Sequence, residues 1–363
     1  FEAAFGDNRL YLDFTYYKTD SRNQILKLAT TAASGYTSQV RNAGHIRNRG
    51  YEIQLGAVPI QTSKGFRWNL DLNYGANSSK VVKLDDEGLI TSYQLYSSGI
   101  QILASVGEAY GTLFGTSYVR DANGNVVVDA NGLPKISTTN KTLGKFTPDW
   151  TGGISNTFSY RSLSLSFLID ASVGGSIFSN TNKTGKYTGV LANTLSGRDA
   201  EHGGLWYYTD AMGNNVRLSE SPSYSVSSDG LYYAQVNGQS TRVYQDGIMV
   251  EGVTESGSKN EEVVSAEKYY HRIYSIAEAN VYDASYVKLR EVALSYRLPR
   301  LWTQKLHLQE ASVTLTGRNL WTIYKSVPNI DPESALTTGN AQGVEAYSLP
   351  TTRSFGVNLS VKF

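Results

Sequence analysis

The chain contains no cysteine, only 2 methionines among its 363 residues, and no long apolar run. The absence of cysteine excludes a disulfide framework, a thiolate metal site and a thiol nucleophile. The absence of a run of about 18 apolar residues excludes a transmembrane helix. A chain without disulfides is compatible with passage through an oxidising compartment, because it needs no such crosslinks there.

The chain also lacks an excess of charge of either sign. Its 33 Lys and Arg residues balance 32 Asp and Glu residues, which gives a net charge of +1. Such a balance provides no broad electrostatic surface for nucleic acid or acidic lipid, so no nucleic-acid partner is predicted. The first residues, FEAAFGDNRL, lack the basic start and apolar core of a signal peptide. If the protein is exported, we expect this sequence to be part of a longer one whose signal peptide and N-terminal region come earlier.

Residue patterns typical of catalysis or metal binding are scarce. The four histidines lie far apart in the sequence, without metal-ligand spacing: His45, His202, His271 and His307. The stretch closest to a pocket motif is GRDAEHGGLWYY, 197–208, whose charged residues are interpreted as solvated loop charges. We therefore predict no enzyme activity, no catalytic residue, no cofactor and no metal.

Two Asn-Gly pairs in DANGNVVVDANGLP, 121–134, are strong signals for tight turns. Asp121, Asn123 and Asn125 also have the spacing of a calcium loop, but no bidentate Glu follows at the required distance. The segment therefore predicts turns and not a metal site.

What the chain does contain is tyrosine, 26 residues of it, and alternating apolar residues. In its last stretch every second residue is apolar: Phe355, Val357, Leu359, Val361 and Phe363. This period of two is typical of a two-faced strand, either in a soluble sandwich or in a transmembrane barrel. A terminal strand that ends on Phe363 favours the barrel, because outer-membrane barrels typically close with such a strand, and we interpret Phe363 as a barrel-assembly signal.

The same alternation predicts about eight strands, after a short strand end at residues 1–5. They cover residues 9–18, 51–57, 66–77, 149–160, 163–171, 286–298, 313–317 and 354–363. The strand at 286–298 changes its apolar phase, which predicts a β-bulge at Arg290 and Glu291.

The connections between these strands alternate strictly in length. Short turns fall at 59–65, 160–162 and 299–310, and long segments at 19–46, 78–148, 176–282 and 322–350. Short turns on one side and long loops on the other are typical of a bacterial outer-membrane barrel, whereas a soluble sandwich has no reason to sort its loops. We therefore predict an all-β fold, an antiparallel transmembrane β-barrel with the long segments extracellular and the turns periplasmic.

Five motifs resemble the C-terminal half of SusC/RagA-family TonB-dependent transporters, in the order in which the family has them. They are GEAYGTLFGTSYVRD (107–121), GKFTPDWTGGISNTFSYR (144–161), DASYVKLREVALSYRLP (283–299), GRNLWTI with downstream DPE (317–333), and LPTTRSFGVNLSVKF (349–363). One departure is Glu291, where the resemblance leads us to expect an Asn-like residue.

This resemblance implies that the chain is the C-terminal portion of a large plugged barrel of about 22 strands. It also implies a SusD-like surface lipoprotein as a lid, and energy supplied by TonB–ExbB–ExbD through a missing N-terminal region. A self-contained eight-stranded barrel is the alternative architecture. The function implied is import of oligosaccharides or oligopeptides across the outer membrane, and the alternative is a non-transporting structural scaffold in a surface complex.

Aromatic residues in the longest loop are the candidates for contact with the substrate or the lid. They are Trp206, Tyr207, Tyr208, Tyr232, Tyr233, Tyr269 and Tyr270. Their faces suit stacking on sugars or packing against a lid protein, and packing within the loop is the alternative. Asp331 and Glu333, with Arg318 and Arg353, are expected to brace the final loop and rim.

Overall fold

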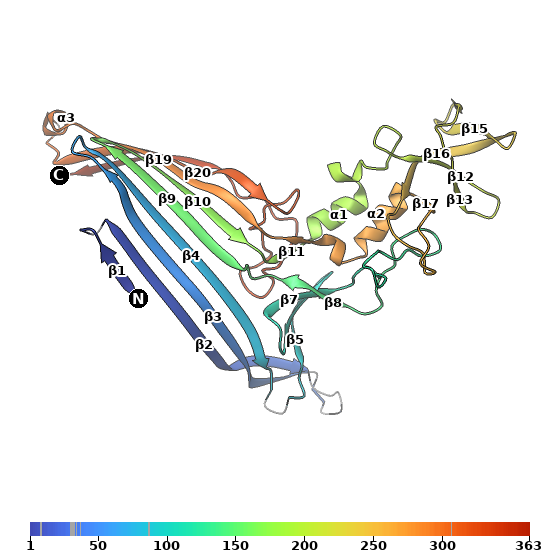
Figure 1. Ribbon diagram of the computed structural model, residues 1–363, viewed down its shortest axis with the longest axis horizontal. Coiled ribbons are helices and arrows are strands. Elements are labelled where there is room, and N and C mark those ends of the chain that lie inside the picture. Colours follow the sequence, from blue (N-terminus) through green and yellow to red (C-terminus); the bar gives the residue numbers. More distant parts are fainter. Residues whose placement is uncertain (8, 30–32, 34, 37, 86–87, 306) are drawn as a thin grey trace.

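The computed structural model describes residues 1–363 except 8, 30–32, 34, 37, 86–87 and 306. Its main element is a curved, fully antiparallel sheet of nine strands in the order β1-β2-β3-β4-β9-β10-β19-β20-β22 (Figure 1). These strands are β1 (Glu2–Phe5), β2 (Leu10–Ala29), β3 (Ser38–Gln61), β4 (Phe66–Lys83), β9 (Trp150–Tyr160), β10 (Leu163–Val173), β19 (Tyr286–Arg297), β20 (Glu310–Lys325) and β22 (Ser354–Lys362). The all-β, antiparallel prediction is confirmed.

The sheet is open within the described residues, because β1 and β22 form its two edges and do not pair with each other. This arrangement contradicts the alternative of a self-contained eight-stranded barrel.

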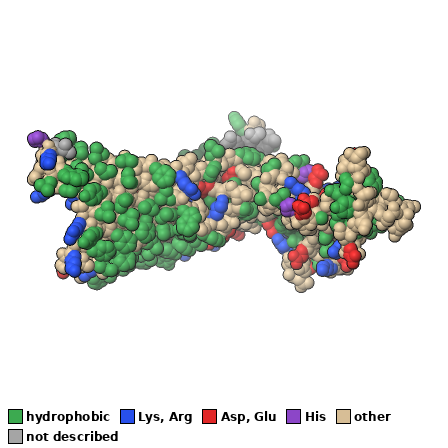
Figure 2. Space-filling view, turned by 90° about the horizontal axis from the view of Figure 1, so that it is seen from above, with side chains coloured by type: hydrophobic (Ala, Val, Ile, Leu, Met, Phe, Trp, Pro, Cys, Tyr) green, Lys and Arg blue, Asp and Glu red, His purple; other side chains and the backbone are tan. Residues whose placement is uncertain are grey.

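The predicted alternation produces an apolar row that crosses the sheet. Directly paired positions link Leu12, Leu55, Leu72, Ile154, Ile169 and Leu289 from β2 to β19. Successive side chains of a strand point to opposite faces, so the neighbouring row is polar: Asp13, Gln54, Asn73, Gly153, Asp170 and Lys288. Figure 2 shows the dense hydrophobic covering of one part of the surface.

The predicted β-bulge is present in β19. Leu168 pairs with Glu291 and Ile169 with Leu289, so Arg290 has no partner on β10. The pairing of β19 with β20 shifts at the same place. The extra residue restores the apolar row, which the change of phase in the sequence required.

Several strands are longer than the sequence pattern predicts. The segment 19–46, predicted as a loop, is mostly strand, because β2 runs to Ala29 and β3 begins at Ser38. Likewise β4 continues to Lys83 and β20 covers residues from Glu310 to Lys325. Apolar alternation marks only the part of a strand that has one face in apolar surroundings. Backbone pairing between the strands continues beyond that part.

The short connections match their predicted positions and lie together at one end of the sheet, which we call the turn end. One is the turn between Tyr160 and Leu163, where Arg161 has a φ of 52°. Another contains the short helix α3 (Arg300–Lys305). The opposite end, from which the long segments extend, is called the loop end (Figure 1).

The segments 78–148 and 176–282, predicted as long loops, contain helices and strands of their own. The first holds the sheet β5 (Ser92–Ser97), β6 (Gln101–Ser105), β7 (Tyr110–Gly115) and β8 (Lys141–Lys145). The second holds β11 (Ser176–Ser179), α1 (Asn180–Thr188), η2 (Ala192–Thr194), β12 (Leu205–Thr209), β13 (Asn215–Arg217), β14 (Tyr224–Val226), β15 (Tyr232–Val236), β16 (Gln239–Met249), β17 (Val263–Ser265), α2 (Ala266–Tyr274), η3 (Glu278–Asn280) and β18 (Val281–Asp283). Most of these elements are too short to give a clear periodicity.

Three long segments share one hydrophobic core at the loop end. It contains Ile102 and Leu113 from the first segment, Phe178 and Ala277 from the second, and Val344 from β21 (Val344–Glu345) in the last. The strand β11 pairs with both β18 and β21. The long segments therefore form one packed structure above the sheet.

None of the helices in the described residues has the length and apolar character needed to cross a membrane.

Candidate functional site

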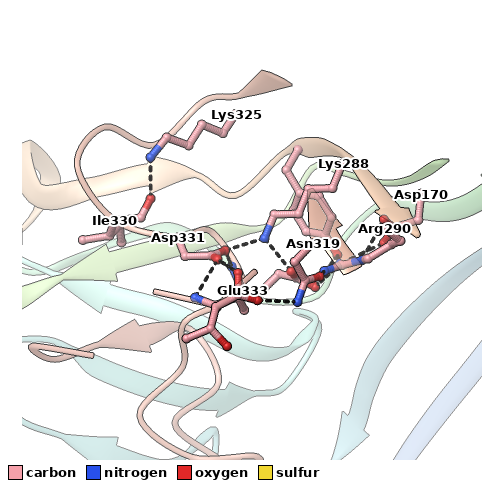
Figure 3. Close-up of polar contacts among 11 residues, drawn as sticks. Asp170, Lys288, Arg290, Asn319, Lys325, Ile330, Asp331 and Glu333 are labelled. Carbon is pink, nitrogen blue, oxygen red and sulfur yellow. Dashed lines mark hydrogen bonds and ion pairs between the residues drawn. The ribbon is translucent and has the colours of Figure 1, made fainter. Parts of the chain in front are cut away.

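A group of five charged side chains, which we call the rim cluster, lies at the loop end of the sheet. It consists of Asp170 on β10, Lys288 and Arg290 on β19, and Asp331 and Glu333 in the final loop (Figure 3). The Lys288 Nζ atom lies 2.6 Å from Asp331 Oδ1 and 2.5 Å from Glu333 Oε2. The Arg290 Nε atom lies 2.8 Å from Asp170 Oδ1, and Arg290 also bonds Glu333.

The charges in the rim cluster lower the pKa of two of its carboxyl groups, those of Asp331 and Glu333. Burial opposes ionisation of Asp331, but hydrogen bonds from Lys288 and Thr351 outweigh it and lower the pKa of that carboxyl to about 2. Burial also opposes ionisation of Glu333, whose pKa is lowered by Arg290 and Lys288. Lys288 is only 3% exposed, so these carboxylates compensate a buried cation.

The rim cluster attaches the final loop to the strands, as expected for Asp331 and Glu333. Neither of the two arginines expected beside them forms an ion pair with Asp331 or Glu333, although Arg353 lines a pocket together with Asp331 and Lys288. Arg318 bonds Glu291 of the neighbouring strand at 2.8 Å. Arg353 makes no ion pair with any residue that the structure describes.

A second attachment of the final loop is the buried carboxylate of Glu345, which the sequence analysis did not identify. It accepts hydrogen bonds from Ser179 Oγ at 2.6 Å and from Thr181 Oγ1 at 2.5 Å. The backbone N–H groups of Thr181 and Ser348 also donate to it. Ser179 is the N-cap of α1, so the carboxylate lies at the positive end of the helix dipole.

Three of the seven predicted aromatic residues form a core within the outer lobe, which we define as residues 205–265. Trp206, Tyr208 and Tyr232 pack with Ala234 and Val243. The Trp206 ring centroid lies 5.8 Å from that of Tyr232, in an edge-on arrangement. Packing within the loop, the alternative interpretation, therefore describes these three.

Two further predicted residues lie elsewhere in the lobe. The Tyr207 ring stacks on Tyr244 with centroids 5.1 Å apart, and its hydroxyl donates to Asp246 Oδ1 at 3.2 Å. Burial and the nearby Asp246 carboxylate raise the pKa of Tyr207. Tyr233 is half-buried on β15, where it pairs with Arg242 of β16.

Tyr269 and Tyr270, the last two, lie on α2 and line a cavity of about 650 Å³. The Tyr270 hydroxyl donates to the main-chain oxygens of Asn193 and Ser196, at 3.1 and 3.0 Å. The helix α2 begins after Ser265, whose Oγ accepts from Lys268 N. The seven aromatics therefore do not form one surface, and their role as contact residues stays a prediction.

The motifs interpreted as turns and loop charges have local partners. Asp121 Oδ1 accepts from the backbone N–H groups of Asn123 and Asn125, which closes the predicted turn. His202 Nδ1 lies 2.7 Å from Asp199 Oδ1. Within the described part of the chain, no group of three or more His, Cys, Asp or Glu residues could hold a metal ion. Phe363 directly follows β22, and its role in assembly stays a prediction.

Comparison with known proteins gives relatives that align with the entire chain, although no family model matches it. TonB-dependent receptor P3 from Formosa agariphila is 26% identical, and the alignment covers 100% of this chain and 33% of P3. TonB-dependent receptor P26 from the same organism is 24% identical and is covered to 34%. The chain thus spans about a third of the length of these relatives, and the similarity to TonB-dependent receptors predicted from the motifs is confirmed.

Solved structures with the same fold include the RagAB peptide transporter, with a TM-score of 0.61 and 19% identity. The RagAB peptide importer in the 'open-open' state aligns with a TM-score of 0.61 and 17% identity. Each alignment covers 100% of this chain and 34% of the other chain. The nine-stranded sheet therefore has the fold of one part of a much larger β-barrel.

Proposed function

We propose that this chain forms the C-terminal part of the wall of a TonB-dependent outer-membrane transporter. The observation that carries the proposal is the continuous apolar row on one face of the sheet, in a chain similar along its whole length to TonB-dependent receptors. The row faces lipid, the turn end faces the periplasm, and the loop end faces the medium. The free backbone groups of β1 and β22 cannot remain unpaired in a bilayer, so further strands complete the barrel.

The opposite face of the sheet forms part of the path for the substrate. Small polar side chains dominate it, as at Ser155, Thr157, Ser164 and Ser166. A shallow cavity of about 300 Å³ on the wall includes Gln54, Asp71, Asn73 and Ser155 among its lining residues. Such a surface offers many weak hydrogen bonds along the wall, which suits passage of a polar substrate.

The substrate we propose is an oligopeptide, with oligosaccharides as the alternative. RagAB, whose fold the chain shares, is described as a peptide transporter. A SusD-like lipoprotein covers the loop end, where the shared core of three long segments provides a firm seat for a partner. TonB–ExbB–ExbD acts through a plug and Ton box encoded before this part of the chain.

Uptake measurements with the full-length protein test this function. A strain that expresses the complete receptor is compared with one that expresses it without its Ton box, using labelled oligopeptides and labelled oligosaccharides. We expect peptide uptake to fall to background without the Ton box while the protein remains in the outer membrane. Peptide uptake that does not depend on the receptor would contradict the proposal.

The scaffold alternative predicts a different result in the same experiment. Deleting the whole receptor would disperse its surface partners, whereas deleting the Ton box would change neither uptake nor assembly. Pull-down of the SusD-like lipoprotein with the complete receptor, and with the receptor that lacks its Ton box, measures assembly separately from transport.

A further inference from the structure

The cavity beside α2 has the size of a small-molecule site and lies away from the strands of the barrel wall. Its volume is about 650 Å³, and its lining comes from four parts of the long segments: residues 118–134, 193–205, 247–251 and α2. A volume in the range of roughly 300 to 1,000 Å³ is large enough to accommodate a ligand of a few hundred daltons. We therefore considered which chemistry its walls select.

Much of the wall is aliphatic. Val126, Leu205, Ile248, Met249 and Val250 line the cavity together. A wall of branched and thioether side chains lowers the free energy of a bulky apolar group by removing it from water. Sugars would leave their hydroxyl groups without partners on such a surface, which costs free energy.

The polar side chains that line the cavity are those of three tyrosines, Asn193, Ser196 and Glu251. The hydroxyls of Tyr118 and Tyr269 make no hydrogen bond within the described residues, although both rings line the cavity. Burial raises the pKa of both phenols, so each remains a neutral hydrogen-bond donor at neutral pH. Tyr270 differs, because its hydroxyl is already used by two main-chain oxygens.

The charge of the cavity wall also bears on which ligand it can bind. Glu251 is the one lining residue, among those the structure describes, with a carboxyl, amino or guanidinium group, and it forms no ion pair there. A single carboxylate attracts a cationic group and disfavours acidic ligands, including sulfated or uronic sugars.

We propose that this cavity binds a segment of an oligopeptide outside the barrel, before entry into the lumen. A bulky apolar side chain packs on the aliphatic wall, main-chain carbonyls accept hydrogen bonds from Tyr118 and Tyr269, and a neighbouring Lys or Arg side chain pairs with Glu251. The inference rests on the proposed function for the choice of peptides, and it adds a capture site on the outer segments.

The two methionines of the chain allow a test that localises the bound peptide. Met249 lines the cavity, whereas Met212 is 85% exposed on a turn of the outer lobe. The probe is the peptide Gly-Leu-Bpa-Lys-Gly, in which Bpa is benzoylphenylalanine, whose excited ketone inserts readily into methionine C–H bonds. It is irradiated with the complete receptor in nanodiscs, and mass spectrometry measures labelling at both methionines.

We expect at least tenfold more label at Met249 than at Met212, and competition by unlabelled Gly-Leu-Phe-Lys-Gly but not by neutral or sulfated oligosaccharides. The double variant Tyr118→Phe with Tyr269→Phe keeps both rings and should reduce labelling at Met249 about tenfold, which corresponds to two hydrogen bonds. Tyr224→Phe, a tyrosine of the outer lobe outside the cavity, is the matched control and should have no effect.

The charge is tested by Glu251→Gln with a second probe in which Glu replaces Lys. The unaltered receptor should prefer the Lys probe several-fold, and the variant should lose this preference. Equal labelling of Met212 and Met249, or competition by oligosaccharides, would overturn the inference.

The same data separate this inference from the transport proposal. Selective labelling of Met249 in a receptor that imports no peptide would leave the cavity as a peptide site and remove the transport function. Peptide import with no selective label at Met249 would leave transport intact and remove the capture site.

Discussion

Lys288 is a cation that the polar face of the sheet buries almost completely between Asp331 and Glu333. Lys288→Met keeps the length of the side chain and removes its charge, which leaves two carboxylates close together with only Arg290 to compensate them. We expect this variant to lose about 3 kcal/mol of unfolding free energy, as for other broken buried ion pairs. Urea unfolding of the complete receptor in lipid vesicles measures the loss.

The matched control is Arg318→Met on the neighbouring strand. Arg318 also bonds a carboxylate, Glu291, but its side chain is 66% exposed. Exposed pairs contribute at most about 1 kcal/mol. A loss for Lys288→Met no larger than that for Arg318→Met would show that the rim cluster does not hold the final loop.

Asp331 predicts a pH dependence of stability. Its folded-state pKa is lowered from 3.8 to about 2, so the folded state binds this proton less readily than the unfolded state. Its contribution is therefore fully present above about pH 4 and disappears as the pH falls towards 2. We expect Asp331→Asn to have a flatter stability profile than the unaltered receptor between pH 4 and 2, and parallel profiles would contradict the assignment.

The structural role of a single residue could be predicted only where its partners were near in sequence or where it belonged to a distinctive motif. The DPE motif indicated that Asp331 and Glu333 brace the final loop. Lys288 was not identified as their partner, because it lies 43 and 45 residues away and nothing in its strand marks it. The role of Glu345 was not predicted for the same reason, since its partners Ser179 and Thr181 are more than 160 residues away in the sequence.

At the scale of elements, β22 carries the clearest prediction about the membrane. Leu359 belongs to its apolar row and pairs with Val313, while Asn358 belongs to the polar row and pairs with Thr314. Leu359→Arg should lower the free energy of unfolding by about 2 to 4 kcal/mol, which is the destabilisation expected for an Arg near the middle of a bilayer. Folding yield in lipid vesicles checks this, with Asn358→Arg as the control on the other face. Equal yields for the two variants would show that the faces are assigned wrongly.

The strands of the wall were predicted well because a bilayer imposes a strict apolar period on one face. The bulge at Arg290 was predicted for the same reason, since the sequence changed phase there. The parts of β2 and β3 nearest the loop end were missed because their sequences, 19–29 and 38–46, show no sustained apolar alternation. Backbone hydrogen bonds, which any sequence supplies, continue these strands.

At the scale of the whole molecule, the structure predicts uneven stability. The strands β9, β10 and β19 have neighbours on both sides, whereas β14 has three residues and pairs only with β15 at an edge of the outer lobe. We expect amides of β14 to exchange with solvent on the order of a hundredfold faster than those of β10. Hydrogen-exchange mass spectrometry of the complete receptor measures both, and equal protection without a bound partner would contradict this order.

The packing of the long segments against one another could not be predicted from the sequence. Their shared core joins Ile102, Phe178 and Val344, which come from three segments separated by strands of the wall. Each segment alone contains mostly short strands without a sustained apolar period, so its pattern predicts an irregular loop. Of the predicted aromatic contacts, Tyr269 and Tyr270 line the cavity beside α2, whereas Trp206, Tyr208 and Tyr232 pack within the outer lobe, because the surroundings of a loop residue cannot be deduced from its type.

The hairpin of β2 and β3 has a consequence for the shape of the surface above the membrane. Its strands have 20 and 24 residues, whereas about 10 residues suffice to cross a bilayer. The shorter of the two, β2, measures about 65 Å, so in the proposed orientation roughly half of its length lies outside the lipid. Beyond the last pair of β3 with β4, at His45 and Lys83, the described residues of β2 and β3 are paired with each other. In the proposed orientation, this two-stranded part extends beyond the other strands on one side of the loop end, so a globular partner that approaches from that side meets it first.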